Sequence, residues 1–187
     1  MAYRSCVAAF LKPIPMSVRE LERLRRPRSD RNRIGDEVEI EVAKILNRHG
    51  YAVQPTGAIG SVKGAPQFYL PDSSTFHLSP DLIACRPGRR LVVEAKQRKL
   101  YLSKGLYSPM TRVLYIDEQI VVGMADFAEH FDSEAIYAFR LEDGRYISAS
   151  HKDITPHTAQ IYKAATATAK AAFTFEASMF RPFEEMI

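Results

Sequence analysis

The 187-residue sequence has no tryptophan and only two cysteines, Cys6 and Cys85. Two cysteines build neither a disulfide framework nor a metal site, so a disulfide-rich secreted scaffold is excluded and a reducing, cytoplasmic setting is expected. No apolar run approaches the roughly 20 residues of a membrane helix. The N-terminal apolar stretch is short and is followed by KPIPM, which is unlike a secretion signal. We therefore expect no membrane partner.

Hydrophobic residues make up 46% of the chain and charged residues 26%, which is typical of a globular domain with a sizeable core. The apolar patterns predict helices over residues 36–50 and 117–131, a strand near 51–55, a hairpin around Pro87-Gly88 and two strands flanking a turn at 142–144. This order predicts an α/β fold, a mixed sheet flanked by helices. Residues 57–78 read as a long loop or small insertion.

Three regions are expected along the chain. Residues 1–34 form a basic N-terminal extension, with a short helix ending at Pro27 and a flexible arm after it. Residues 35–155 form the main domain. Residues 156–187 form a helical C-terminal tail, Ala-rich and then Phe-rich, packed on the domain or at a dimer interface.

Positive charge is concentrated in two segments. Residues 19–33 carry seven arginines against three acids, and residues 86–104 carry seven basic residues against Glu94 alone, although the net charge is only +4. This segregation indicates a surface that faces phosphates; a solvated charged face fits the charge pattern equally well. The candidate DNA-binding residues are Arg25, Arg26, Arg28, Arg31, Arg33, Arg98, Lys99 and Lys104.

The predicted hairpin brings two acids together. A turn centred on Pro87-Gly88 places Ile83 opposite Val92 and Asp81 opposite Glu94, with Cβ atoms about 4.5–5.5 Å apart. Lys96 shares a face with Glu94 because side chains alternate along a strand. Two opposed carboxylates repel each other, and a hard divalent cation such as Mg²⁺ offsets that repulsion. The alternative is a surface hairpin whose acids pair with Lys96 and nearby arginines.

A third acid belongs to the helix at 36–50. Val38, Val42 and Leu46 mark its buried stripe, and Glu39 lies at the margin of that stripe. A carboxylate held toward a sheet needs a partner. Glu39 is therefore a further candidate for the site, the alternative being a boundary residue paired with an arginine.

The segments Pro80-Asp81 and Glu94-Ala95-Lys96 match the PD-(D/E)xK nuclease signature. Residues 35–53 resemble the first helix of archaeal-type Holliday junction resolvases, in which a glycine is followed four residues later by the catalytic glutamate. Gly35 and Glu39 occupy those places. The resemblance spans about residues 35–150 in element order and implies a restriction-endonuclease-like fold.

The resemblance also implies roles for individual residues. Asp81, Glu94, the backbone of Ala95 and Glu39 would bind Mg²⁺, with Mn²⁺ as a substitute, and Lys96 would orient water or stabilise charge in the transition state. Ser61 takes the place of a functional serine, although an insertion of roughly residues 62–78 follows it. Gln119 takes the place of a helical glutamine near the site in related nucleases.

Three functions are compatible with these features. The first is a homodimeric, metal-dependent enzyme that cuts four-way DNA junctions by phosphodiester hydrolysis, acting on nucleoid or viral DNA. The second is another PD-(D/E)xK nuclease of the repair, flap or restriction type. The third is a DNA-binding module without catalysis, whose acids are structural. Metal-dependent cleavage of branched and linear DNA distinguishes them.

Overall fold

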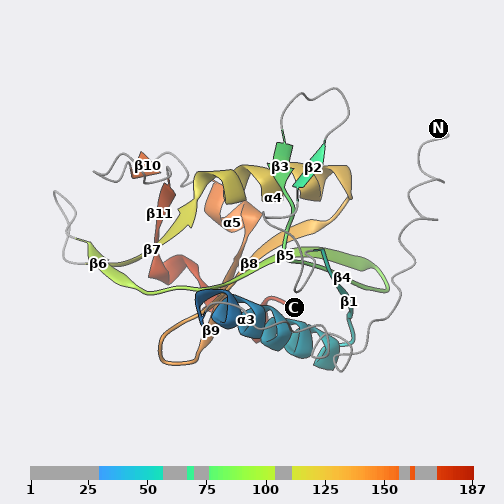
Figure 1. The fold of residues 1–187 in the computed structure, drawn as a ribbon, viewed down its shortest axis with the longest axis horizontal. Coiled ribbons are helices and arrows are strands. Elements are labelled where there is room, and N and C mark those ends of the chain that lie inside the picture. Colours follow the sequence, from blue (N-terminus) through green and yellow to red (C-terminus); the bar gives the residue numbers. More distant parts are fainter. Residues whose placement is uncertain (1–29, 57–66, 70–75, 104–110, 156–160, 163–171) are drawn as a thin grey trace.

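The computed structural model describes residues 30–56, 67–69, 76–103, 111–155, 161–162 and 172–187 (Figure 1). The largest sheet has six strands in the order β1-β4-β5-β8-β9-β12. Its strands are β1 (Ala52–Pro55), β4 (Leu82–Arg86), β5 (Arg89–Gln97), β8 (Glu134–Arg140), β9 (Tyr146–Ser150) and β12 (Arg181–Pro182). Neighbours pair antiparallel except β5 and β8, which are parallel. The predicted mixed α/β sheet is confirmed.

Two helices cover opposite faces of this sheet (Figure 1). Helix α3 (Asp30–Arg48) packs Val38, Val42 and Leu46 on one face, where Leu91 and Val93 of β5 point. Helix α4 (Glu118–His130) packs on the other face, where Val92 points. The two central strands are therefore buried on both sides, which explains their nearly continuous apolar runs.

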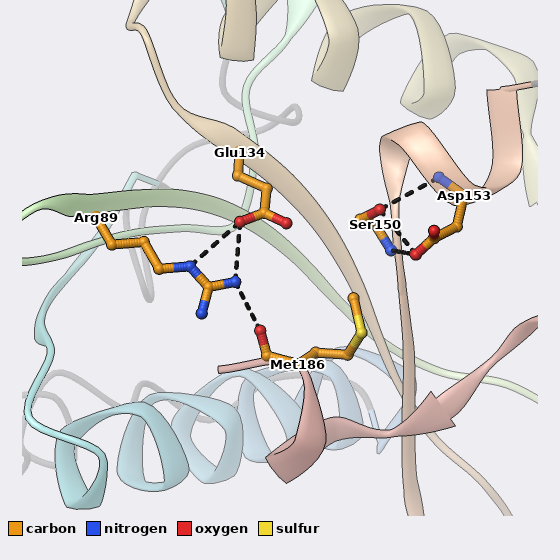
Figure 2. Close-up of polar contacts among 5 residues, drawn as sticks. All are labelled: Arg89, Glu134, Ser150, Asp153 and Met186. Atoms are coloured by element: carbon orange, nitrogen blue, oxygen red, sulfur yellow. Dashed lines mark hydrogen bonds and ion pairs between the residues drawn. The ribbon is translucent and has the colours of Figure 1, made fainter.

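A second sheet adjoins the α4 side. It has the order β10-β11-β7-β6, with β6 (Tyr101–Ser103), β7 (Thr111–Asp117), β10 (Ile161–Tyr162) and β11 (Ala172–Glu176). A separate pair, β2 (Gln67–Tyr69) and β3 (Phe76–Leu78), lies within the segment predicted as a loop or insertion. The short helix α5 (His151–Ile154) begins with a capping box in which Ser150 and Asp153 bond reciprocally (Figure 2).

The first helix starts earlier than predicted. Residues 27–35 were expected to form a flexible arm, but α3 already begins at Asp30. No proline interrupts the segment from Asp30 to Arg48, and a single glycine, Gly35, costs a helix only about 1 kcal/mol. The expectation of an arm is therefore wrong for Asp30–Gly35, while the predicted helix before Pro27 lies outside the described residues.

The described part of the C-terminal tail is not a long helix. It consists of β11, the 3-10 helix η2 (Ala177–Met179), β12 and the 3-10 helix η3 (Phe183–Glu185). β-propensity explains β11, because its sequence AFTFE is rich in aromatic and β-branched residues. The Ala-rich run predicted to be helical falls largely outside the described residues. The helical prediction is wrong for residues 172–187.

The end of the tail joins the main core. Phe183 is 1% exposed and belongs to the apolar cluster that α3 forms with the sheet. Figure 2 shows Arg89 of β5 reaching both Glu134 of β8 and the backbone of Met186. The Arg89 guanidinium donates to Glu134 Oε2 at 2.9 Å and to the Met186 carbonyl at 2.7 Å.

None of the described helices is long and apolar enough to cross a membrane.

Candidate active site

The β4–β5 hairpin has the predicted register. Ile83 pairs with Val92 and Leu82 with Val93 around the turn that contains Gly88, whose φ is +77°. Continuing this register by one residue sets Asp81 against Glu94. The main chain of Asp81 is fixed from the neighbouring strand, because its carbonyl accepts a hydrogen bond from the Thr56 N–H at 3.0 Å.

The two acids and the lysine of the hairpin form one polar cluster. Lys96 Nζ lies 2.8 Å from Asp81 Oδ2 and 2.8 Å from Glu94 Oε1. Asp81 Oδ2 also accepts the backbone N–H of Ala95 at 2.9 Å. The Glu94 residue is only 4% exposed, so its carboxylate is held in a largely dry environment. The predicted patch of two carboxylates and an ammonium is therefore confirmed as a contact cluster.

Glu39 approaches the cluster from α3. Burial and then the charge of Asp81 raise the pKa of Glu39 to about 8, against the attraction of Lys96. The carboxyls of Asp36 and Glu94 add smaller contributions of the same sign. Glu39 therefore belongs to the same electrostatic group as the hairpin acids, as its place at the edge of the apolar stripe predicted.

Burial and neighbouring charges shift the pKa values of Glu94 and Lys96. Burial and then the charge of Asp81 raise the pKa of Glu94 to about 7, against the attraction of Lys96. Desolvation lowers the pKa of Lys96, but Glu94 and Asp81 outweigh it, so the net shift is upward. One ammonium therefore faces several carboxyls, and the cluster gains protons or another cation readily.

Glu39→Gln is expected to stabilise the metal-free protein at pH 8. The folded-state pKa of Glu39 is about 8 against an ordinary 4.5, so the folded state retains a proton that the unfolded state releases. Stability therefore falls as pH rises from about 4.5 to 8, and an amide removes this loss. We expect a rise in melting temperature of at least about 3 °C at pH 8.

The check is thermal unfolding of both proteins in EDTA at pH 5 and pH 8. The gain should be much smaller at pH 5, where the wild-type carboxyl is mostly protonated in the folded state. An equal gain at both pH values, or a loss at pH 8, would contradict the assignment of Glu39 to the cluster.

The donor chemistry of the cluster suits a hard divalent cation. Asp81, Glu94 and Glu39 offer carboxylate oxygens, and Ala95 offers a backbone carbonyl, all of which are ligand types that Mg²⁺ prefers. Within the described part of the chain, however, no group of three or more His, Cys, Asp or Glu side chains has metal-binding geometry. Lys96 instead supplies the positive charge between the two hairpin acids. The ligand roles of these four residues stay predictions.

The remaining predicted site residues are placed differently. Gln119 is exposed near the start of α4 and, within the described ranges, makes no hydrogen bond to the cluster. Arg98 is partly buried, with its guanidinium 6.0 Å from the centre of the Phe139 ring. Lys99 is exposed and lies 3.3 Å from Glu142. The backbone of α3 includes Arg31 and Arg33. The predicted residues outside the described ranges are Ser61, Arg25, Arg26, Arg28 and Lys104.

Sequence reasoning missed a tyrosine beside the cluster. Tyr137 of β8 is the parallel-sheet partner of Glu94, and its hydroxyl lies 2.9 Å from His151 Nδ1. Burial and then the charge of Glu94 raise the pKa of Tyr137 above its ordinary range, so the phenol stays neutral. The strand EAIYAFR was predicted, but its pairing with β5 is a long-range choice that no local pattern specifies.

Comparison with known proteins decides the family. The family model described as archaeal Holliday junction resolvase (Hjc) matches residues 30–186. The chain belongs to this resolvase family. The resemblance based on Gly35, Glu39 and the hairpin motif is thereby confirmed, and the match extends through the C-terminal tail.

One solved structure shows the same fold. Hjc from Archaeoglobus fulgidus, a Holliday junction resolvase from an archaeal hyperthermophile, is 20% identical, with a TM-score of 0.50 over 81% of this chain and 93% of that one. A nuclease from a fusselovirus is 13% identical, with a TM-score of 0.40 over 79% of this chain and 81% of that one. Among curated protein sequences, none matches the chain significantly. As a member of the Hjc family, the chain has a nuclease fold and is a DNA-acting enzyme.

Proposed function

We propose that this Hjc-family protein is a divalent-metal-dependent endonuclease that resolves four-way DNA junctions by phosphodiester hydrolysis. The observation that carries the proposal is the cluster of Asp81, Glu94 and Lys96 on one hairpin, with Glu39 brought to it by α3. A cluster with excess carboxyls and one fixed ammonium is suited to a cation and a phosphate together. A hairpin with a purely structural role would not require the carboxyl of Glu39 beside the cluster of Asp81, Glu94 and Lys96.

Asp81, Glu94, Glu39 and the Ala95 carbonyl are the groups that would hold Mg²⁺. The metal, when bound, polarises a phosphoryl oxygen and activates a water molecule. The raised pKa values of Glu39 and Glu94 support this role, because a bound cation replaces the protons that these carboxyls otherwise retain. Cation binding is therefore expected to release protons near neutral pH.

Lys96 has a separate role in the proposed reaction. The upward shift of its pKa keeps the ammonium charged throughout the neutral range. Its side chain is 30% exposed, so the charge is accessible to a phosphate at the cluster. A fixed positive charge beside the scissile phosphate stabilises the negative charge that develops on its oxygens. Asp81 and Glu94 hold this ammonium in place from both sides.

Resolution of a junction needs two nicks placed symmetrically, so we propose an isologous homodimer. Two surfaces are candidates for the interface, the Phe-rich tail and helix α4. The first is less suitable, because Phe173, Phe175, Phe180 and Phe183 are all buried within their own chain. On α4, Val122 is 45% exposed, which leaves the second surface as a candidate.

The decisive experiment compares a labelled immobile four-way junction with the linear duplex of the same sequence, each in Mg²⁺, Mn²⁺ and EDTA. We expect paired, symmetric nicks in the junction with either metal and no cleavage in EDTA. Equal cutting of the duplex would favour another PD-(D/E)xK nuclease. Tight binding without cutting in both metals would favour a binding module, and either result would refute the resolvase.

A further inference from the structure

A pocket of about 440 Å³ lies next to the active-site strand. It is formed where β5 ends, where β6 and β7 pair, and where the turn after β8 approaches. Its lining residues are Gln97, Arg98, Lys99, Tyr101, Tyr115, Asp117 and Glu142. Gln97 directly follows Lys96 on β5, so the main chain at the pocket lies roughly 3 Å along the strand from that of Lys96, although the two side chains point to opposite faces.

Two tyrosines give the pocket an aromatic wall. Tyr101 of the edge strand β6 pairs with Val113, and Tyr115 lies two residues further along β7 on the same face. Their ring centres are 5.4 Å apart with an interplanar angle of 58°. The alternate residues Leu114 and Ile116 belong to the core, so the tyrosines face away from it. Tyr101 is 49% exposed, an unusually open position for a large ring.

The polar groups of the pocket are of mixed sign. Arg98 and Lys99 supply donors, Asp117 and Glu142 supply acceptors, and Lys99 is already paired with Glu142 at 3.3 Å. Two carboxylates make this a poor place for a phosphate. A nucleobase suits it better, because its edge carries both donors and acceptors and its face stacks on aromatic rings.

We propose that this pocket binds an unpaired nucleobase at the branch point of the DNA, stacked on Tyr101, while the Lys96 cluster engages the adjacent backbone. The inference rests on the proposed function and adds to it a means of recognising branched DNA. A fully paired duplex presents no free base face, so the pocket contributes to binding only where bases are unstacked. This selects branched over linear DNA without reading sequence.

The test uses Tyr101→Ala in the full-length protein, with binding measured by fluorescence anisotropy in EDTA to prevent cleavage. The probes are a four-way junction, a fork with unpaired bases and a linear duplex. Loss of one stacked base is expected to weaken binding to the junction and the fork about tenfold and to leave the duplex unchanged. On a fork with abasic residues at the branch, Tyr101→Ala should add no further loss.

Two further variants separate stacking from structure. Tyr101→Phe keeps the ring and should bind within about twofold of wild type. Leu102→Ala removes an exposed neighbouring side chain of β6, 64% exposed and outside the pocket lining, and should bind like wild type. Unchanged binding of the junction and fork by Tyr101→Ala would overturn the inference, as would an equal loss on linear duplex.

Failure of this inference is distinguishable from failure of the proposed function. If the wild type cuts junctions while Tyr101→Ala binds them normally, only the base pocket is wrong. If the fork requires Tyr101 while junctions stay uncut in Mg²⁺ and Mn²⁺, the resolvase is wrong and the pocket stands.

Discussion

Asp81→Asn is expected to lower the rate of junction cleavage by at least about a thousandfold while leaving DNA binding intact. The side chain contacts Lys96 Nζ at 2.8 Å and the Ala95 N–H at 2.9 Å. Asparagine keeps an oxygen for the Ala95 N–H, so the hairpin retains its geometry. It loses the negative charge that would hold the metal. The measurement is single-turnover cleavage in Mg²⁺, with binding measured separately in EDTA.

Asp143→Asn is the matched control. Asp143 lies in the exposed turn between β8 and β9 and pairs with Arg145 at 2.7 Å, remote in sequence from the hairpin. The substitution makes the same change of charge, so an effect of net charge on DNA binding appears in both variants. We expect the control to cut like wild type. Cleavage by Asp81→Asn within about tenfold of wild type would rule out Asp81 as a metal ligand.

Local chemistry made the active-site hairpin predictable. Pro87-Gly88 defines a turn, the two apolar runs define strands, and the register between them follows from the turn alone. Asp81, Glu94 and Lys96 could therefore be brought together without any knowledge of the rest of the fold. Glu39 was predictable in the same way, because helical periodicity places it at the edge of a buried stripe.

Long-range pairing made the rest unpredictable. The parallel contact of β5 with β8 sets Tyr137 beside Glu94, yet paired positions of the two strands lie 43 residues apart in the sequence. In the sheet that forms the tyrosine pocket, β7 pairs with β11. These two strands are far apart in the sequence, and part of the chain between them lies outside the described residues. Only the pairing of β6 with β7 shows that the rings of Tyr101 and Tyr115 meet.

The C-terminal tail shows how tertiary structure overrides composition. Its aromatic residues were consistent with an amphipathic helix, an interface or core. In the structure they are buried from the strands and short helices of the tail, with Phe173, Phe175 and Phe180 in the α4 cluster and Phe183 in the α3 cluster. One short segment thus contributes to both apolar layers, which makes its stability inseparable from that of the sheet.

Phe183→Ala is accordingly expected to destabilise the protein by about 3–5 kcal/mol, the usual range for deleting a buried phenylalanine. Phe183 is 1% exposed and shares a cluster with Val38 and Val42 of α3. In a chain of this size the loss corresponds to a fall in melting temperature of roughly 6–20 °C. The measurement is thermal and urea unfolding followed by circular dichroism.

Glu184→Ala provides the control, because Glu184 is exposed and its ion pair with Arg48 is 3.9 Å long. An exposed ion pair of that length contributes little, so the melting temperature should change by no more than about 2 °C.

Phe183 supports the helix that carries Glu39, so the Phe183 variant should lose cleavage activity on warming well before wild type does. A melting temperature unchanged by Phe183→Ala would mean that the tail is a separate appendage. A fall of the expected size would make residues 172–187 an integral part of the nuclease core.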